Sequence, residues 1–462
     1  MKTLNKIAIA AACAAVALPI SAQNTYSGYF LDNYDYAFQM NPAFGNEKNF
    51  VSFPVIGNLN LGVRGTLHLK DVLYNVDGKT VLFTNPEVNT ADAMSKFGNN
   101  NKLVANEKID IMSAGFKKWG GYNTISISAV VNAGVSIPKT FFELAKEGIT
   151  NKTYDIKNMA VDANAYAQLA FNHSRDIKAV PGLRVGAAFK VLIGVGGVQA
   201  KFNQAELELG TNNWIARTNA DIYASIGGLN FKTKTYEPEG NTGMKPYEYV
   251  NDAKIDHFYP TGFGLGFDLG AQYQWRDFKF SIAAVDLGFM RYGRTQWAST
   301  NGTRTFETDA YTFNVQGDAE NSFKNEFKDL KDNLSKLYNL ENMGTKSYFA
   351  RGLATTLNFG VDYALPVYRK LHFGLLNSTR IYGPFTSTHF RLSANVAPCK
   401  VFSANVNYGI GTYGSDFGWL LNLHAPGFNL FLGMDHTLGK LAKQGVPLSS
   451  NATMNFGIDF PF

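Results

Sequence analysis

Residues 262–273 read GFGLGFDLGAQY, and every second residue in this run is apolar. One face of an extended strand would carry Phe263, Leu265, Phe267, Leu269, Ala271 and Tyr273. The other face would carry the glycines, Asp268 and Gln272. Such alternation predicts a β-strand with one apolar and one polar face. The run is about twice as long as a typical sandwich strand, and it matches the roughly 9 to 11 residues that a tilted strand needs to cross a membrane.

The same alternation recurs in runs that start at Leu59, Met159, Leu183 and Leu353. The segments fall near 58–69, 107–117, 123–136, 158–172, 182–195, 199–209, 213–226, 259–275, 277–292, 347–364, 370–383, 386–397, 400–412, 415–424, 428–437 and 452–462. They number about sixteen, and fourteen is the alternative if weak segments merge, because bacterial barrels have even counts. We therefore expect an all-β fold, a transmembrane antiparallel β-barrel of about 14–16 strands.

The composition favours the same class. Charged residues are 17% of the chain, aromatic residues are 14%, and there are 44 glycines, whereas soluble domains carry roughly 25% charged residues. No apolar run after Ile20 approaches the length of a membrane helix, and no linker divides the chain into the several domains expected of a soluble protein this long. The basic residues are scattered, which argues against nucleic acid as a partner.

Short and long connections alternate along the predicted strands. The long ones are 70–106, 227–258 and 293–346. The short ones are Lys117–Asn123, His173–Gly182, Gly210–Asn213, Gln274–Asp277, Pro366–Lys370, Pro398–Lys400 and Ala425–Gly427, and Gly194-Val195-Gly196-Gly197 predicts a further tight turn. Outer-membrane barrels have short periplasmic turns and long external loops. The alternation therefore predicts the cell outer membrane of a Gram-negative bacterium, with both termini periplasmic.

Both ends of the chain carry export signals. Lys2 and Lys6, an apolar run over 7–20 and the small residues Ser21-Ala22 indicate a signal peptide over 1–22. Its removal leaves Cys399 as the one cysteine, which excludes an internal disulfide. The last strand alternates Met454, Phe456, Ile458, Phe460 and Phe462 with polar residues and glycine. This ending resembles the signal read by the barrel-assembly machinery, which we expect as a partner through Phe462, beside outer-membrane lipid.

Residues 23–50 do not alternate, and we expect them to form a plug inside the barrel or a segment at its periplasmic rim, ahead of a barrel over 51–462. Asn41-Pro42-Ala43-Phe44 predicts a turn, because proline cannot donate to a strand ladder. The run Asn41-Pro42-Ala43-Phe44, Phe50-Val51-Ser52-Phe53-Pro54, Gly57-Asn58-Leu59-Asn60 resembles an uncharacterised Bacteroidota outer-membrane barrel family, and also FadL-like transporters and barrels associated with type IX secretion. The resemblance covers the N-terminal quarter and implies no particular substrate.

Two loop segments predict helices. Phe323, Phe327, Leu330, Leu334 and Leu337 form one apolar stripe, which indicates a helix within 322–341. It would cover the barrel mouth, or act as a gate or docking element. Residues 141–145 predict a second, shorter helix.

Motifs for catalysis, cofactors or metals are missing from the sequence. No zinc spacing, phosphate loop or nucleophile elbow occurs, and the adjacent Asp-His pairs are Asp256-His257 and Asp435-His436. We therefore expect no enzyme, no cofactor and no metal site.

Charged residues on the polar parity of the strands are candidates to line the lumen. They are Arg64, Asp162, Arg184, Lys190, Asp268, Asp362 and Arg380, and they would form ion-pair networks or line a solute path. Asp286 falls among the apolar positions of its strand, which predicts a bulge near Ala283-Ala284.

We expect passive transport of small hydrophobic or amphipathic solutes. The alternative is a structural or accessory barrel of a secretion or surface-assembly complex.

Overall fold

The computed structural model describes residues 25–46, 48–54, 57–147, 151–210, 213–236, 246–309, 340–437 and 451–462. The predicted signal peptide (1–22) and residues 322–339 of the predicted loop helix lie outside these ranges. The chain is an all-β protein, and its strands pair antiparallel throughout one large sheet.

Fourteen strands close into a ring within the described residues. In order around the ring they are β2 (Asn58–Gly65), β5 (Asn100–Lys118), β6 (Gly121–Pro138), β8 (Ala160–Asp176), β9 (Leu183–Leu209), β13 (Gly262–Trp275), β14 (Phe278–Ser299), β17 (Thr355–Ala364), β18 (Leu371–Ile381), β19 (Ser387–Cys399), β20 (Phe402–Gly411), β21 (Gly414–Ala425), β22 (Phe428–Met434) and β23 (Ala452–Pro461). The ring closes where β23 pairs with β2, with Phe456 opposite Leu59.

The count of fourteen, rather than sixteen, has two causes. The predicted strands at 182–195 and 199–209 are one strand, β9, of 27 residues. The expected turn at Gly194–Gly197 is wrong, because the glycines continue the strand and Val195 forms a bulge where the β8–β9 register shifts. The predicted strand at 213–226 is β10 (Asn213–Ile226), which lies beyond the ring and pairs with β9, β14 and β15.

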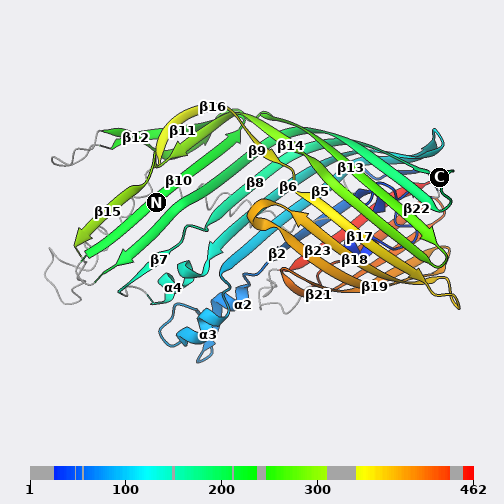
Figure 1. Cartoon of the computed structure of the whole chain (residues 1–462), viewed down its shortest axis with the longest axis horizontal. Coiled ribbons are helices and arrows are strands. Elements are labelled where there is room, and N and C mark those ends of the chain that lie inside the picture. Colours follow the sequence, from blue (N-terminus) through cyan, green and yellow to red (C-terminus); the bar gives the residue numbers. More distant parts are fainter. Residues whose placement is uncertain are drawn as a thin grey trace.

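The wall continues past the ring at one end (Figure 1, left). This extension contains β10 and the outer parts of β9 and β14, together with β7 (Lys152–Asp155), β11 (Leu229–Tyr236), β12 (Tyr247–Ile255), β15 (Arg304–Asp309) and β16 (Glu341–Gly352). The predicted strand at 347–364 is therefore divided between β16 and β17. The predicted short connection at Gly210–Asn213 lies in the extension and not with the other short turns. The reason is that β9 crosses the whole ring wall and continues into the extension, where the chain turns back into β10.

A small helical lobe packs beside the extension. It contains α2 (Leu69–Val72), β3 (Leu73–Val76), β4 (Lys79–Leu82), α3 (Thr90–Ser95) and α4 (Lys139–Glu147). The rings of Phe97 and Phe142 stack at 4.0 Å at its centre. The short helix predicted over 141–145 lies within α4. Three 3₁₀ turns, η1 (Tyr26–Gly28), η2 (Ala37–Gln39) and η3 (Gly383–Phe385), complete the described elements.

The opposite end of the barrel carries the remaining short turns and the C-terminal end of β23. There β1 (Phe50–Ser52) pairs with β23 and β5, and the Phe462 amide donates to the carbonyl of Asn49 at 2.9 Å. We call this the short-turn end.

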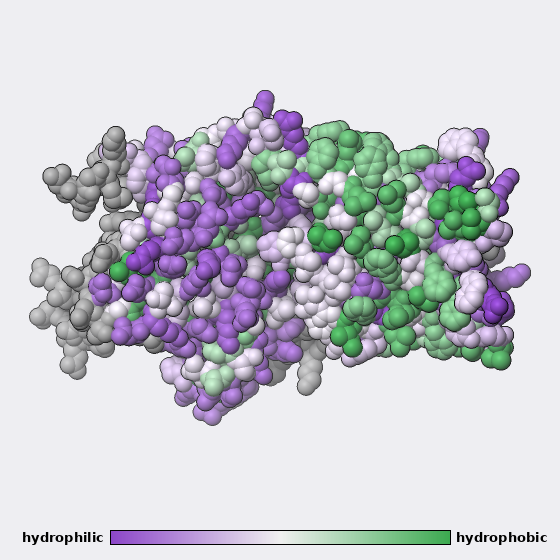
Figure 2. All heavy atoms as spheres, viewed as in Figure 1, coloured by the Kyte–Doolittle hydropathy of each residue, from purple (hydrophilic) through white to green (hydrophobic). Residues whose placement is uncertain are grey.

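The two faces of the ring differ as the alternation predicts. Leu169, Leu392 and Ile410 point outward and are 50%, 62% and 60% exposed, whereas their polar neighbours face the interior. Figure 2 shows the exposed apolar residues as a belt over the half that contains the C-terminus, with hydrophilic residues over the extension. Among the described residues, no helix is long and apolar enough to cross a membrane.

Candidate functional site

The N-terminal segment, residues 25–46, occupies the interior of the ring. Its aromatic residues form one buried cluster with wall residues such as Leu376, Leu420 and Phe431. Tyr34 and Phe431 meet edge-to-face at 5.1 Å. A single segment without regular strands can stay inside a barrel only if its backbone polar groups find partners there. Wall side chains supply such partners, since Ser403, Asn422 and Asn358 donate to carbonyls of the segment at 3.0, 2.8 and 2.8 Å. Three further places attach the segment through other polar groups.

The first place is Asp435, which follows β22. Its carboxylate accepts hydrogen bonds from the amides of Tyr26 and Ser27 at 2.9 and 2.7 Å, and from Ser27 Oγ at 2.6 Å. The guanidinium groups of Arg64 and Arg391 lie 5.2 and 5.3 Å from the centre of the Tyr26 ring. Charge-assisted bonds and cation–π contacts therefore hold the first turn of the segment.

The second place is the turn Asn41-Pro42-Ala43. Asn41 Nδ2 donates to the carbonyls of Ala271 and Ile282, each at 3.3 Å, and Asn172 Nδ2 donates to the Pro42 carbonyl at 3.3 Å. Arg184 Nε donates to the carbonyl of Ala43 at 2.9 Å. The turn that the sequence predicts thus lies against the inner wall of the barrel.

Wall glycines allow this approach. A Cβ on Gly186 would lie 2.0 Å from the Pro42 carbonyl oxygen, and one on Gly270 would lie 2.1 Å from Asn41 Oδ1. Because real Cβ atoms do not approach so closely, only glycine fits at these two positions while the segment is in place.

The third place is a pair of carboxylates near the short-turn end. Asn429 Nδ2 donates to Asp35 Oδ2 at 3.2 Å and to Asp459 Oδ2 at 3.0 Å. Both carboxylates are buried. The amide links the N-terminal segment to strands β22 and β23.

Six of the seven candidate lumen residues, Arg64, Asp162, Lys190, Asp268, Asp362 and Arg380, are buried inside the barrel, and Arg184 is half-buried nearer the short-turn end. They do not form one network. Lys190 Nζ lies 2.7 Å from Asp268 Oδ2 and 2.6 Å from Asp286 Oδ1. Arg351 Nη1 lies 2.6 Å from Asp162 Oδ1, and His372 Nδ1 lies 3.1 Å from Asp362 Oδ2.

Asp286 reaches the lumen through a bulge. In the β13–β14 pair, Phe267 faces Leu287 and Leu269 faces Ala284, so Val285 and Asp286 together oppose the single residue Asp268. The bulge therefore lies just after the predicted Ala283-Ala284. Asp286 has a φ of 61°, and its amide donates to Asp268 Oδ1 at 2.7 Å. On its other edge, β14 pairs with β17 up to Val285 and with β16 from Phe289 onward, so the change of partner occurs beside the bulge.

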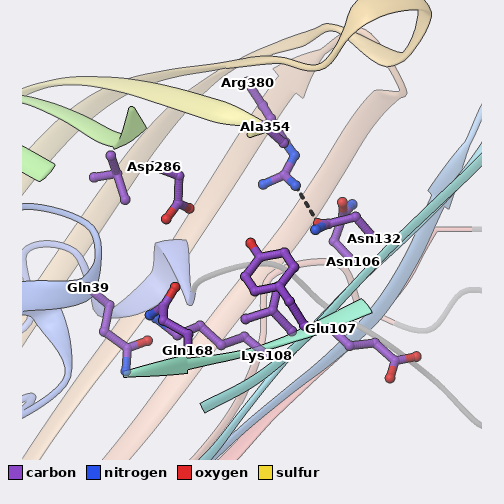
Figure 3. Close-up of a pocket in the computed structure, with 12 residues that line it drawn as sticks. Gln39, Asn106, Glu107, Lys108, Asn132, Gln168, Asp286, Ala354 and Arg380 are labelled. Atoms are coloured by element: carbon purple, nitrogen blue, oxygen red, sulfur yellow. Dashed lines mark hydrogen bonds between the residues drawn. The ribbon is translucent and has the colours of Figure 1, made fainter. Parts of the chain in front are cut away.

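A small cavity lies in the lumen next to the N-terminal segment, and we call it the chamber (Figure 3). Its volume is about 30 Å³, room for about two waters. Gln39, Lys108, Asn132, Gln168, Asp286 and Arg380 supply its polar lining, and Val130, Tyr166 and Val285 are among its less polar lining residues. Arg380 Nη2 donates to Asn132 Oδ1 at 2.6 Å.

Two buried donors of the chamber lack a partner among the described residues: Arg380 Nε and Gln168 Nε2. Lys108 lines the same space and forms no ion pair with another described residue. Lys108 was not among the predicted lumen residues, although it alternates in step with the polar residues Asn106 and Asp110. Arg351 and Arg391 were not among them either, although they lie in strands that the alternation had located.

The two Asp-His pairs lie in different surroundings, one exposed and the other buried. Asp256 and His257 are exposed in the extension. Asp435 binds the N-terminal segment, and the adjacent His436 places Nδ1 3.0 Å from Asp416 Oδ2. No group of three or more metal-binding side chains occurs in the part of the chain that the structure describes.

Several solved barrels are similar to this chain at low scores. A mutant of the monoaromatic hydrocarbon channel TodX has a TM-score of 0.41 and 8% identity, with 92% of this chain and 94% of that chain covered. A FadL homologue from Pseudomonas aeruginosa has a TM-score of 0.39 and 9% identity, with 96% and 97% covered. The toluene transporter TodX from P. putida has a TM-score of 0.36 and 7% identity, with 96% and 93% covered.

No curated protein matches the sequence. The model of a family of unknown function, DUF5723, matches residues 42–435. The match begins at Pro42, inside the turn that contacts the wall glycines, and ends at Asp435, the residue that binds the first turn of the N-terminal segment. The chain belongs to family DUF5723.

Proposed function

We propose that this protein spans the outer membrane, with its short-turn end toward the periplasm, and passes small hydrophobic or amphipathic solutes passively through its lumen. The apolar belt around the closed ring supports the membrane location, because lipid-facing residues of transmembrane barrels are apolar. The N-terminal segment acts as the plug, and its displacement opens the path.

The unpaired donors of the chamber carry the proposal. Buried polar groups in proteins are nearly always hydrogen-bonded. Arg380 Nε and Gln168 Nε2 have no partner among the described residues, so we expect water or a polar group of a solute to occupy the chamber beside them. Tyr166 and Val130 bound the same space. The chamber now has room for about two waters, and with the plug displaced its donors, beside Val130 and Val285, would suit amphipathic solutes that carry a hydrogen-bond acceptor.

The mode of attachment supports a movable plug. The segment is held by hydrogen bonds, ring contacts and two glycine-lined approaches rather than by a strand ladder, except at β1. Such contacts can separate without opening the backbone pairing of the ring.

Conductance across planar bilayers tests the proposal. We expect the full chain to show small, infrequent openings, and a variant that lacks residues 25–46 to show a larger and steady conductance. Swelling of liposomes that contain the same variant should report the passage of benzyl alcohol and benzoate as amphipathic probes. The matched control deletes residues 77–78 in the hairpin of the helical lobe, and its conductance should equal that of the full chain.

A folded, membrane-inserted deletion variant without conductance or solute flux would contradict transport. That result would favour the alternative, a structural or accessory barrel of a secretion or surface-assembly complex. The observation that favours this alternative is the buried attachment at Asp435, where three donors meet one carboxylate. Stable partner proteins recovered with the full chain would then be expected.

A further inference from the structure

The turns at the short-turn end repeat one pattern, an aromatic residue next to a basic residue. The sequences are Lys117-Lys118-Trp119, Trp275-Arg276 and Tyr368-Arg369-Lys370. They belong to the turns after β5, β13 and β17, and all of these residues are exposed. The pattern therefore occurs on separate parts of the circumference.

The aromatic residues lie at the margin of the apolar belt. Trp119 is 65% exposed, Trp275 is 49% exposed and Tyr368 is 44% exposed. The Trp119 ring lies 6.3 Å from that of Phe171, whose side chain belongs to the belt. Exposed tryptophan and tyrosine at the edge of an apolar belt mark the level of lipid headgroups.

Basic residues outnumber acidic ones at this end. Arg175 is exposed near the end of β8, and Lys178 and Lys400 are exposed on further turns. Among the described residues, Arg369 forms an ion pair with Asp277 at 2.6 Å, whereas Lys117, Lys118, Lys178 and Lys400 form none. Figure 2 shows hydrophilic residues at the extremity of the molecule, beyond the apolar belt. We call Lys117, Lys118, Lys178, Arg276, Arg369 and Lys400 the basic rim.

Backbone conformation adds an independent indication. Trp119 has a φ of 55° and Arg276 has a φ of 53°. Hairpin turns normally place glycine, asparagine or aspartate in this left-handed region, because other side chains are strained there. Trp119 lies near the rings of Phe116 and Phe171, and Arg276 lies over the ring of Trp275, yet both side chains remain exposed. Their presence points to a contact outside the chain.

We propose that the basic rim binds the phosphate groups of anionic phospholipids in the leaflet that surrounds the short-turn end; this rests on the membrane-spanning function proposed above. A lipid fits better than an acidic protein for two reasons. The cations are distributed over several turns rather than gathered on one side, and each pattern pairs a cation with an outward aromatic residue. Lipid headgroups present phosphate at that depth around the whole circumference.

Native mass spectrometry of the full chain, purified with equal amounts of phosphatidylglycerol and phosphatidylcholine, tests the proposal. We expect the wild-type chain to retain phosphatidylglycerol preferentially. A rim variant with Lys117→Gln, Lys118→Gln, Lys178→Gln and Lys400→Gln should lose about tenfold or more of that preference, because each basic residue near an anionic surface contributes attraction. The matched control carries Lys79→Gln, Lys96→Gln, Lys232→Gln and Lys234→Gln, four exposed lysines away from the rim.

Equal retention of both lipids by the wild-type chain would overturn the proposal, and so would the same preference in the wild-type and rim variants. Capture of an acidic protein by the rim in the absence of any lipid preference would also overturn it. Failure of the wild-type chain to enter vesicles of either lipid would instead contradict the membrane-spanning function, so the two ideas fail separately. Raised salt should weaken the preference, since these charges are exposed.

Discussion

At the scale of single residues, glycines in the wall set how closely the N-terminal segment approaches it. A Cβ on Gly270 would lie 2.1 Å from Asn41 Oδ1 and 2.8 Å from Pro42 Cδ. Valine is otherwise favoured in strands. We therefore expect Gly270→Val to leave the ring intact but to displace residues 41–43, which should raise bilayer conductance and the hydrogen exchange of the N-terminal segment.

The matched control for this prediction is Gly352→Ala in β16. The nearest heavy atom to a Cβ there lies at 3.9 Å, so the added methyl group meets ordinary contact distance. Its conductance and exchange should match those of the unaltered protein. Unchanged exchange in Gly270→Val would mean that the turn at Asn41 does not depend on the wall glycines.

At the scale of elements, the bulge in β14 brings Asp286 to the same ammonium group as Asp268. Lys190 and Asp268 side chains are each 4% exposed. Lys190→Met should lower the free energy of unfolding by about 3–5 kcal/mol, because it leaves buried carboxylates without their counter-ion. This loss can be measured as a lower urea concentration at the unfolding midpoint. The folded form is followed as its band on gels of unheated samples. Adding Asp268→Asn and Asp286→Asn should restore much of it, and a triple variant as unstable as the single one would contradict this explanation.

Strand alternation predicted the architecture but not the details that depend on long-range packing. Every ring strand was located, since lipid-facing and lumen-facing residues impose a period of two. The preferred count of sixteen was too high, whereas the alternative of fourteen is correct. The glycines at 194–197 resemble a turn in sequence, but β8 and β10 pair with that stretch on both sides, and β10 itself lies beyond the ring. Most charged residues of the lumen occupy the polar positions of the alternating pattern, and these positions can be identified in the sequence. Which of them meet depends on bulges such as the one at Asp286, and no local pattern determines those partners.

At the scale of the whole molecule, orientation can be tested with the native thiol. Cys399 is exposed and unpaired at the short-turn end. If that end faces the periplasm, a membrane-impermeant maleimide should label it only after the outer membrane is permeabilised. The control is Lys79→Cys in a Cys399→Ser background, which should react in intact cells because β4 belongs to the opposite half. Labelling of Cys399 in intact cells would reverse the proposed orientation.

The seam between β2 and β23 has a consequence for biogenesis. It joins the first and last strands of the ring, and β1 next to it also pairs with β23. Ring closure therefore has to wait until β23 has been delivered. The N-terminal segment precedes every strand of the ring, yet its partners Asn429, Asp435 and Asp459 lie in or next to β22 and β23, the last strands of the ring. The N-terminal segment can therefore be fixed inside the ring only when β22 and β23 close the wall. A polypeptide that lacks these two strands would lose both the ring closure and the attachment of the segment.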